Sequence, residues 1–215
     1  MPKNIIIFSS IDEAQKILKY YNDNFNFPNN NYTKEEIINK SVGSNVFRAF
    51  SNLPIPPSQI YREWIKNHFE FFLKNLSKIQ SQKEYDKFIF KISFDFIFSW
   101  KNQMKNNNKN LTFGAGIKII NLFVKMIQET NDFKMNNIYD YMHVPYDKYS
   151  LKPLVKIIND LTELNFKIVI PNNVTMGYIT NPELYLIIHH AVKKLCNHIN
   201  MKPIIYDYWS WDDKH

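Results

Sequence analysis

The sequence predicts an all-α protein, and two observations lead to that fold class. Apolar residues recur at helical spacing along most of the chain, and residues that cap helix N-termini precede several of these segments. A chain of 215 residues can bury one good core, or two small lobes that share a cleft. There is no internal repeat, and we expect no independent second domain.

The first two helices are predicted from their capping residues. Ser10 is followed by acidic residues in what would be a first helical turn, which predicts a helix that runs to about Tyr21. Residues 22–31 form an Asn-rich loop. Thr33, with Glu36 three residues later, matches a capping box and predicts a second short helix.

The middle of the chain predicts two longer helices. The proline-rich segment 53–57 must interrupt any helix, and Ser58 is expected to cap the next one, which runs to about Asn75. Residues 83–103 form a long amphipathic segment. A polar, basic turn over residues 105–110 follows it.

The second half predicts three more helices, over residues 117–129 and 150–165 and from Asn181-Pro182-Glu183 onward. Proline in the first turn, directly after an asparagine cap, is a typical helix start. The remaining segments are an irregular stretch (131–146), a short strand or extended link (166–170) and an aromatic, acidic tail (203–215).

The charge balance favours a polyanionic partner. The chain has 27 basic and 20 acidic residues, a net charge of +7 and a pI of about 9.2. Neutralising phosphates with lysines releases condensed counterions, which favours nucleic-acid binding. The alternative is a soluble surface with spare lysines.

The single cysteine, Cys196, allows no internal disulfide and no cysteine cluster for zinc or iron–sulfur, so we expect a reducing cytoplasm. We interpret Cys196 as a small core residue rather than a reactive thiol. No export signal is visible, and the apolar stretch 88–100 is too short and too charged to span a bilayer. We therefore expect a protein that is neither secreted nor membrane-spanning.

Two of the four glycines lie within residues 113–118, between two apolar-periodic segments. Glycine is used where φ must be positive or where backbone must approach something closely. A tight turn that leads into a helix N-terminus would present several N–H groups to a phosphate. The alternative is an ordinary turn between packed helices.

The run Gly114-Ala115-Gly116-Ile117-Lys118, followed by Asn121, resembles the helix-hairpin-helix motif of the endonuclease III superfamily of DNA glycosylases. In bifunctional members of that superfamily this lysine is the nucleophile. Downstream, Val144-Pro145-Tyr146-Asp147 before a helix is similar to the short apolar stretch that ends in the superfamily's essential aspartate. The resemblance covers about residues 88–160 and implies a two-lobed helical glycosylase fold.

The spacing resembles one branch of that superfamily more than endonuclease III itself. Lys118 and Asp147 are 29 residues apart, a longer gap that is similar to the archaeal 8-oxoguanine DNA glycosylases. That branch has a second lysine seven residues after the nucleophile, and Lys125 matches it. Its aspartate and tryptophan, four residues apart near the C-terminus, match Asp207 and Trp211. The departures are Tyr146 for a small aliphatic residue, a phenylalanine for the proline before the motif, and no iron–sulfur cysteines.

The resemblance assigns roles to both members of the catalytic pair. Lys118 would attack the sugar as nucleophile, and Asp147 would act as acid/base and stabilise the developing positive charge. The alternatives are a phosphate-binding lysine and a helix N-cap. The residues expected to contact DNA are Gly114, Ala115, Gly116, Lys125 and His143, the last of which is otherwise an ordinary loop residue.

A flipped base is usually received by aromatic and polar side chains. The candidates here are Gln15, Trp64, Asp207 and Trp211, with Trp209 a further aromatic. The alternative for each tryptophan, favoured when it is taken alone, is a core residue, and for Gln15 an exposed helical glutamine. Trp100 is expected in the core. The adjacent His189 and His190 should point apart, so we expect no shared metal.

The resemblance also implies the division of the chain and its partners. One lobe would span about residues 33–130, with the hairpin at 111–118, and the second would combine 1–30 with 131–215. The expected protein is a cytoplasmic, nucleoid-associated monomer that binds double-stranded DNA with a flipped base. It would excise 8-oxoguanine or another damaged or modified base. We expect no cofactor, other than a possible structural monovalent cation at the hairpin. The alternatives are a non-catalytic helix-hairpin-helix DNA-binding module and a small helical protein-interaction factor.

Overall fold

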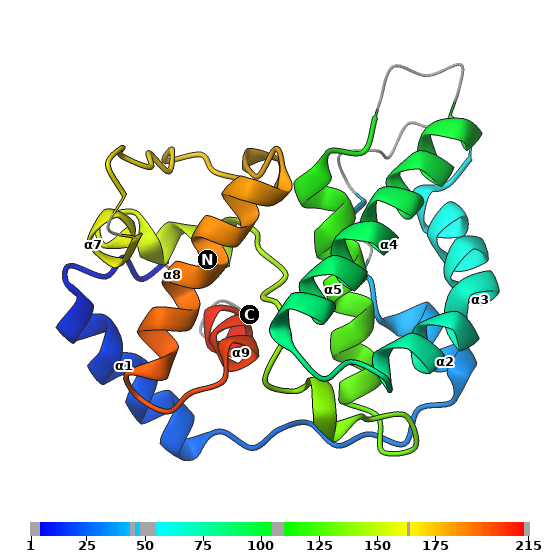
Figure 1. Cartoon of the computed structure of the whole chain (residues 1–215), viewed down its shortest axis with the longest axis horizontal. Coiled ribbons are helices and arrows are strands. Elements are labelled where there is room, and N and C mark those ends of the chain that lie inside the picture. Colours follow the sequence, from blue (N-terminus) through cyan, green and yellow to red (C-terminus); the bar gives the residue numbers. More distant parts are fainter. Residues whose placement is uncertain (1–4, 44–45, 48–54, 105–109, 163, 213–215) are drawn as a thin grey trace. The chain divides into compact units, whose positions relative to one another are not determined.

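The structure, a computed structural model, describes residues 5–43, 46–47, 55–104, 110–162 and 164–212. These residues form helices joined by loops, and they include no β-strand, only an isolated bridge between Asn30 and Thr130 (Figure 1). The predicted all-α class is therefore confirmed. Among the described helices, none has both the length and the apolar character that crossing a membrane requires.

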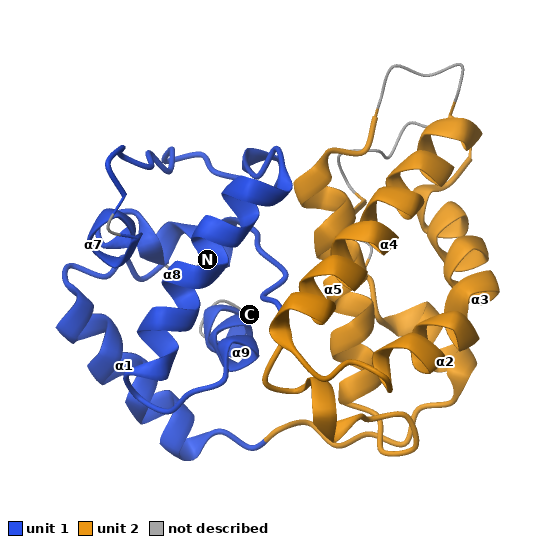
Figure 2. Ribbon diagram, in the orientation of Figure 1, with its two compact units in different colours: residues 1–26, 143–215 blue, residues 27–142 orange. Residues whose placement is uncertain are grey.

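The chain divides into two compact units (Figure 2). Unit 1 combines residues 1–26 with 143–215, and unit 2 spans residues 27–142. Residues 131–142 thus belong to unit 2, and hydrogen bonds to distant residues of that unit explain why. The Asn131 N–H donates to the Asn30 carbonyl at 2.9 Å, and the Asn137 side chain donates to the carbonyl of Ile79 at 2.8 Å.

Unit 2 is built around α5, which has 13 of its 16 residues buried. A helix that is buried on nearly every side needs apolar residues all round, and α5 has them. Phe123 of this helix lies edge-on to Phe72 of α3, with ring centroids 4.9 Å apart. The helices of unit 2 are α2 (Lys34–Lys40), α3 (Pro57–Leu76), α4 (Gln82–Gln103), α5 (Phe113–Gln128) and the short 3₁₀ helix η2 (Asn136–Ile138).

The helix starts of unit 2 follow the predicted capping in one case and depart from it in another. The capping box of Thr33 and Glu36 is present, as predicted. The expected cap at Ser58 is wrong, because α3 begins at Pro57 and Ser58 lies inside its first turn. Proline at the first helical position is favourable, since its missing N–H would have no acceptor within the helix. Residues 53–54 and 105–109 of the predicted breaker and turn lie outside the described residues.

Unit 1 contains two long helices and several short ones. Its helices are α1 (Ile11–Asn24), α6 (Lys148–Leu151), η3 (Lys152–Leu154), α7 (Ile158–Thr162), η4 (Met176–Tyr178), α8 (Pro182–Asn197) and α9 (Pro203–Asp212). The predicted caps Ser10 and Asn181 both accept a hydrogen bond from the backbone three residues later. The single helix expected over residues 150–165 is wrong. Pro153 cannot donate to a carbonyl in the preceding turn, and the segment forms three short helices instead.

The C-terminal segment differs most from its prediction. Residues 203–212 of the aromatic, acidic tail form helix α9, which was not predicted, with Pro203 as the first helical residue. Tyr206 and Trp209 are buried, and the Trp209 ring stacks on Phe8 at 5.0 Å. Cys196 is buried as predicted, and this burial raises the pKa of its thiol.

Residues 166–170 form no strand, so the first of the two predicted alternatives is wrong. The Asn159 side chain accepts from the Ile168 N–H at 2.7 Å and donates to the Ile168 carbonyl at 3.0 Å. These two bonds pair the backbone of Ile168 in the way that a neighbouring strand would.

Candidate functional site

The glycine-containing motif forms the first turn of α5 and not a turn before it. The Thr112 hydroxyl accepts from the Ala115 N–H at 3.3 Å, and the Gly116 N–H donates to the Thr112 carbonyl at 3.0 Å. The helix therefore begins at Phe113, four residues earlier than predicted. No described glycine has a positive φ, so the tight-turn explanation for this pair is wrong.

Close packing explains Gly116 instead. A β-carbon at this position would lie 2.5 Å from Cγ1 and 2.7 Å from Cδ1 of Ile97 on α4. The absence of a side chain thus lets α4 and α5 approach each other. This accounts for Gly116 by helix packing alone.

Lys118 follows this turn and is only 5% exposed. Lysine is among the residues least often buried, because removing an ammonium from water is costly. Asn121 and Lys125 follow at three and seven residues and so lie on the same face of α5. Asn121 is buried and Lys125 is half-buried. Unit 2 therefore holds a buried lysine on its central helix.

Asp147 lies in unit 1, at the start of α6, and is 7% exposed. Its Oδ1 accepts from the Tyr149 N–H at 2.7 Å and from the Ser150 N–H at 3.3 Å. The Ser150 hydroxyl in turn accepts from the Asp147 N–H at 2.8 Å. The predicted position at a helix entrance is confirmed, although the helix begins at Lys148 rather than near Ser150. Asp147 is thus a helix cap, and the cap bonds engage only one of its carboxylate oxygens.

Helix α9 brings two further predicted residues to the α6 region of unit 1. The Tyr206 hydroxyl donates to the Ser150 carbonyl at 2.7 Å, and the Trp211 ring lies 5.2 Å from that of Tyr149. Burial, together with the negative charges of Asp147 and Asp207, raises the pKa of Tyr206. Asp147, Asp207 and Trp211 therefore come from helices that pack on each other, with Asp207 fully enclosed.

The other predicted residues are divided between the units. Gln15 is half-buried on α1 of unit 1. His143 is buried in unit 1, and its ring lies 4.4 Å from that of His189. Trp64 lies on α3 of unit 2, where it stacks on His68 at 4.2 Å. Their roles toward DNA stay predictions. His189 and His190 point apart as predicted, since the first is buried and the second exposed.

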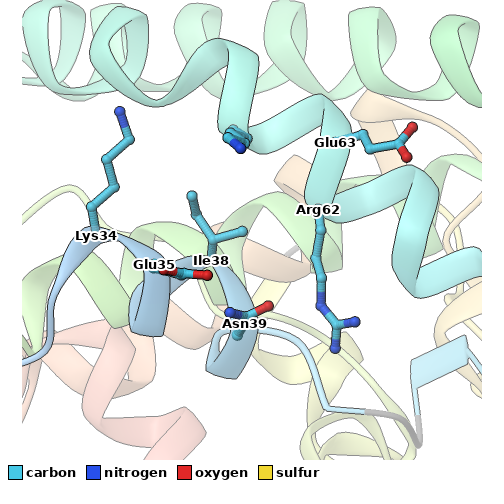
Figure 3. Close-up of a pocket in the computed structure, with 7 residues that line it drawn as sticks. Lys34, Glu35, Ile38, Asn39, Arg62 and Glu63 are labelled. Atoms are coloured by element: carbon cyan, nitrogen blue, oxygen red, sulfur yellow. The ribbon is translucent and has the colours of Figure 1, made fainter.

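A hollow of about 350 Å³ lies between α2 and α3 of unit 2. Figure 3 shows two of its basic side chains, Lys34 and Arg62, extending away from each other. Glu35 and Glu63 also line it, so its charge is mixed. Lys34 is further engaged by Glu70 at 2.7 Å. This lining therefore favours neither an anionic nor a cationic ligand.

The sequence does not single out the exposed aromatics of α4. Phe94 and Phe98 are 48% and 66% exposed. Their spacing along the helix places them opposite the buried Phe96 and Trp100, which a helical projection of residues 83–103 would indicate. In a chain with 17 phenylalanines, that signal is easily overlooked.

Comparisons with models of protein families, with curated proteins and with solved structures found no match for the chain. Within the described ranges, no three side chains of histidine, cysteine, aspartate or glutamate are grouped so that they could hold a metal ion.

Proposed function

We propose that the protein is a DNA glycosylase with lyase activity, of the helix-hairpin-helix type, with Lys118 as nucleophile and Asp147 as its acid/base partner. The observation that carries the proposal is the burial of Lys118 at the position that the motif reserves for the nucleophile. A lysine that served only solubility would lie on the surface, because burying its amine costs free energy. The enclosed amine of Lys118 is therefore suited to a chemical role.

The proposed reaction begins when the neutral Lys118 amine attacks C1′ of the target nucleotide. The bond between C1′ and the base nitrogen breaks, its electron pair leaves with the base, and the base takes up a proton. The amine proton passes to the Asp147 carboxylate, which also stabilises positive charge on the sugar. Ring opening gives a Schiff base, and loss of a C2′ proton then expels the 3′ phosphate. The strand is nicked as a result.

The surroundings of Asp147 support its part in this scheme. Its cap bonds hold the carboxylate in one orientation at a helix start. Trp211 comes from α9, which packs on α6, and in the proposed function it contacts the flipped base. Asp207 of the same helix is buried, so the structure does not support its predicted contact with the base. Oxidised guanine is the proposed base, on the resemblance in spacing alone.

Borohydride trapping tests the proposal. Reduction of the Schiff base should join the protein covalently to duplex DNA that contains an abasic site or 8-oxoguanine. We expect Lys118→Gln and Lys118→Arg to abolish trapping, because neither side chain can form the imine. Lys74→Gln, which replaces an exposed lysine of α3, should trap as wild type does. Thermal melting checks that each variant is folded.

The same experiment separates the alternatives. If no lesion in a panel is trapped or cleaved, the enzymatic function is wrong. If Lys118→Arg keeps salt-sensitive duplex binding and the wild type never traps, the protein is a non-catalytic DNA-binding module. If Lys125→Gln loses trapping and Lys118→Gln retains it, the nucleophile is assigned to the wrong lysine.

A further inference from the structure

Helix α4 presents a continuous exposed row that we call the α4 stripe. Its members are spaced by three or four residues, which places them on one side of the helix. The stripe consists of Lys83, Lys87, Lys91, Phe94, Phe98 and Lys101. The opposite side of α4 carries the fully buried Ile89, Phe96 and Trp100. The stripe is therefore the solvent-facing side of a helix whose core side is already packed.

The composition of the α4 stripe defines the chemistry of its partner. Four lysines contribute positive charge and no acidic residue lies within the row, while Phe94 and Phe98 expose large apolar rings. Exposed aromatic rings between lysines match a partner that is anionic and also offers flat apolar faces. Single-stranded nucleic acid has both properties, because its phosphates are charged and its unpaired bases can stack.

One end of the α4 stripe borders a hollow between α3 and α4, of about 460 Å³. Phe98 belongs to both, and Trp64 and His68 of α3 line the other side. This volume falls within the range of about 300–1,000 Å³ that is usual for small-molecule sites. The hollow therefore combines an exposed ring with enough room for a planar group beside it.

The polar lining of the hollow offers hydrogen-bond partners of defined type. The carbonyl of Trp64 can only accept, so His68 Nδ1, 2.7 Å away, carries the hydrogen. In the neutral imidazole, Nε2 is then an acceptor. The carboxylates of Glu63 and Asp95 add acceptors that match the exocyclic amino group of cytosine, adenine or guanine.

We propose that the α4 stripe binds single-stranded DNA and that the hollow between α3 and α4 receives one unpaired base, stacked on Phe98. The lysines would hold the phosphates outside the hollow, away from its carboxylates. The inference goes beyond the proposed glycosylase, because it requires no chemistry at Lys118. The ring of Phe94 lies 5.3 Å from that of the buried Phe113, the first residue of α5, so the stripe lies beside the start of the glycine-containing helix.

The first test measures the binding of labelled 12-nucleotide single strands by fluorescence anisotropy. Phe98→Ala should weaken binding by about tenfold, since a stacked base is lost. The matched control is Phe166→Ala in unit 1, because Phe166 is 59% exposed and lies outside the stripe. Equal affinities of the Phe98→Ala and Phe166→Ala variants would overturn the proposal.

The second test measures the salt dependence of the same binding. Replacing Lys87, Lys91 and Lys101 with glutamine should reduce the slope of log affinity against log salt concentration by about 2, since each lost phosphate contact contributes about 0.7. The control replaces three exposed lysines of unit 1, namely Lys16, Lys156 and Lys167. An unchanged slope in the stripe variant would overturn the phosphate contacts. Binding to anionic phosphatidylserine vesicles in place of oligonucleotides would also overturn the proposal.

The third test uses oligodeoxycytidine and oligodeoxyuridine, whose bases differ at N3 and at position 4 and both lack the 5-methyl group. We expect tighter binding of oligodeoxycytidine, and Asp95→Ala should remove this preference, because Asp95 accepts from the amino group. A preference that survives in Asp95→Ala would overturn the assigned base contact. If oligonucleotide binding depends on Phe98 and borohydride traps no complex, this inference is supported and the proposed glycosylase function is wrong.

Discussion

The two units differ in charge more than in size. Unit 2 contains 16 lysines and arginines against 10 acidic residues, and unit 1 contains 11 against 10. Nearly all of the basic excess that favours a polyanionic partner is therefore in one unit. Unit 2 also has the long helices α3 and α4, whereas unit 1 includes several helices of one turn or so.

The buried ionisable groups show the opposite distribution. Among the described residues, only one lysine, arginine, histidine, aspartate or glutamate of unit 2 is buried, and this is Lys118. Unit 1 buries four, namely Asp147, Asp207, His143 and His189. Burying these groups costs free energy, which packing elsewhere must offset. The difference teaches that the basic excess and most of the enclosed ionisable groups are supplied by separate parts of the chain. Three further predictions test this division.

The largest expected effect concerns Asp147, whose structural and chemical roles can be separated. Asn is as good a helix cap as Asp, so Asp147→Asn should leave the free energy of unfolding almost unchanged. It should lower base excision by about a hundred- to ten-thousandfold, because an amide cannot accept the proton. Single-turnover excision and urea unfolding measure the two quantities. Asp147→Ala, the comparison variant, should cost about 1 kcal/mol of stability as well. Full activity in Asp147→Asn would reduce this residue to a cap.

A smaller effect concerns the acid sensitivity of unit 1. Burial, followed by the nearby charges of His143, His190 and Lys193, lowers the pKa of His189 well below its usual value. Neither ring nitrogen of His189 has a hydrogen-bond partner in the described structure. As the pH falls, His189 therefore takes up a proton in the unfolded chain, near the usual pKa of about 6.5, before it does so in the folded protein.

The free energy of unfolding therefore does not depend on the protonation of His189 above about pH 6.5. Below that pH it should fall by up to about 1.4 kcal/mol per pH unit. His189→Phe should keep the ring packing and remove this part of the slope. His190→Gln, the exposed neighbour, should keep it. Urea unfolding between pH 7.5 and 5.5, followed by circular dichroism, makes the comparison. The same acid slope in His189→Phe as in wild type would place the acid sensitivity elsewhere.

The smallest effect concerns the packing of unit 2 at Gly116. Alanine is better than glycine in a helix by about 1 kcal/mol, but forcing its β-carbon against Ile97 should cost about 1–3 kcal/mol. Gly116→Ala should therefore destabilise the protein by about 1 kcal/mol. In an Ile97→Ala background the same change should be neutral or stabilising. Stabilisation by Gly116→Ala alone would show that the close approach of α4 and α5 does not require glycine at this position.

Local sequence signals predicted the helix starts that depend on a few neighbouring residues. The caps at Ser10, Thr33 and Asn181 depend on side chains that reach the backbone three residues later, so the sequence contains the whole interaction. Thr112 has the same property, and with Ala115 it moves the start of α5 to Phe113. The sequence also placed Asp147 correctly at a helix entrance.

The sequence by itself thus determined the all-α class, the helix starts at Ser10, Thr33 and Asn181, and the presence of a lysine and an aspartate at motif positions. Only the tertiary structure decided what is buried. It placed Gly116 against Ile97, enclosed Lys118, turned the aromatic tail into α9 beside α6, and left Phe94 and Phe98 exposed on α4. The physical reason is that capping and helical periodicity act over about one turn, whereas burial depends on residues that are distant in sequence.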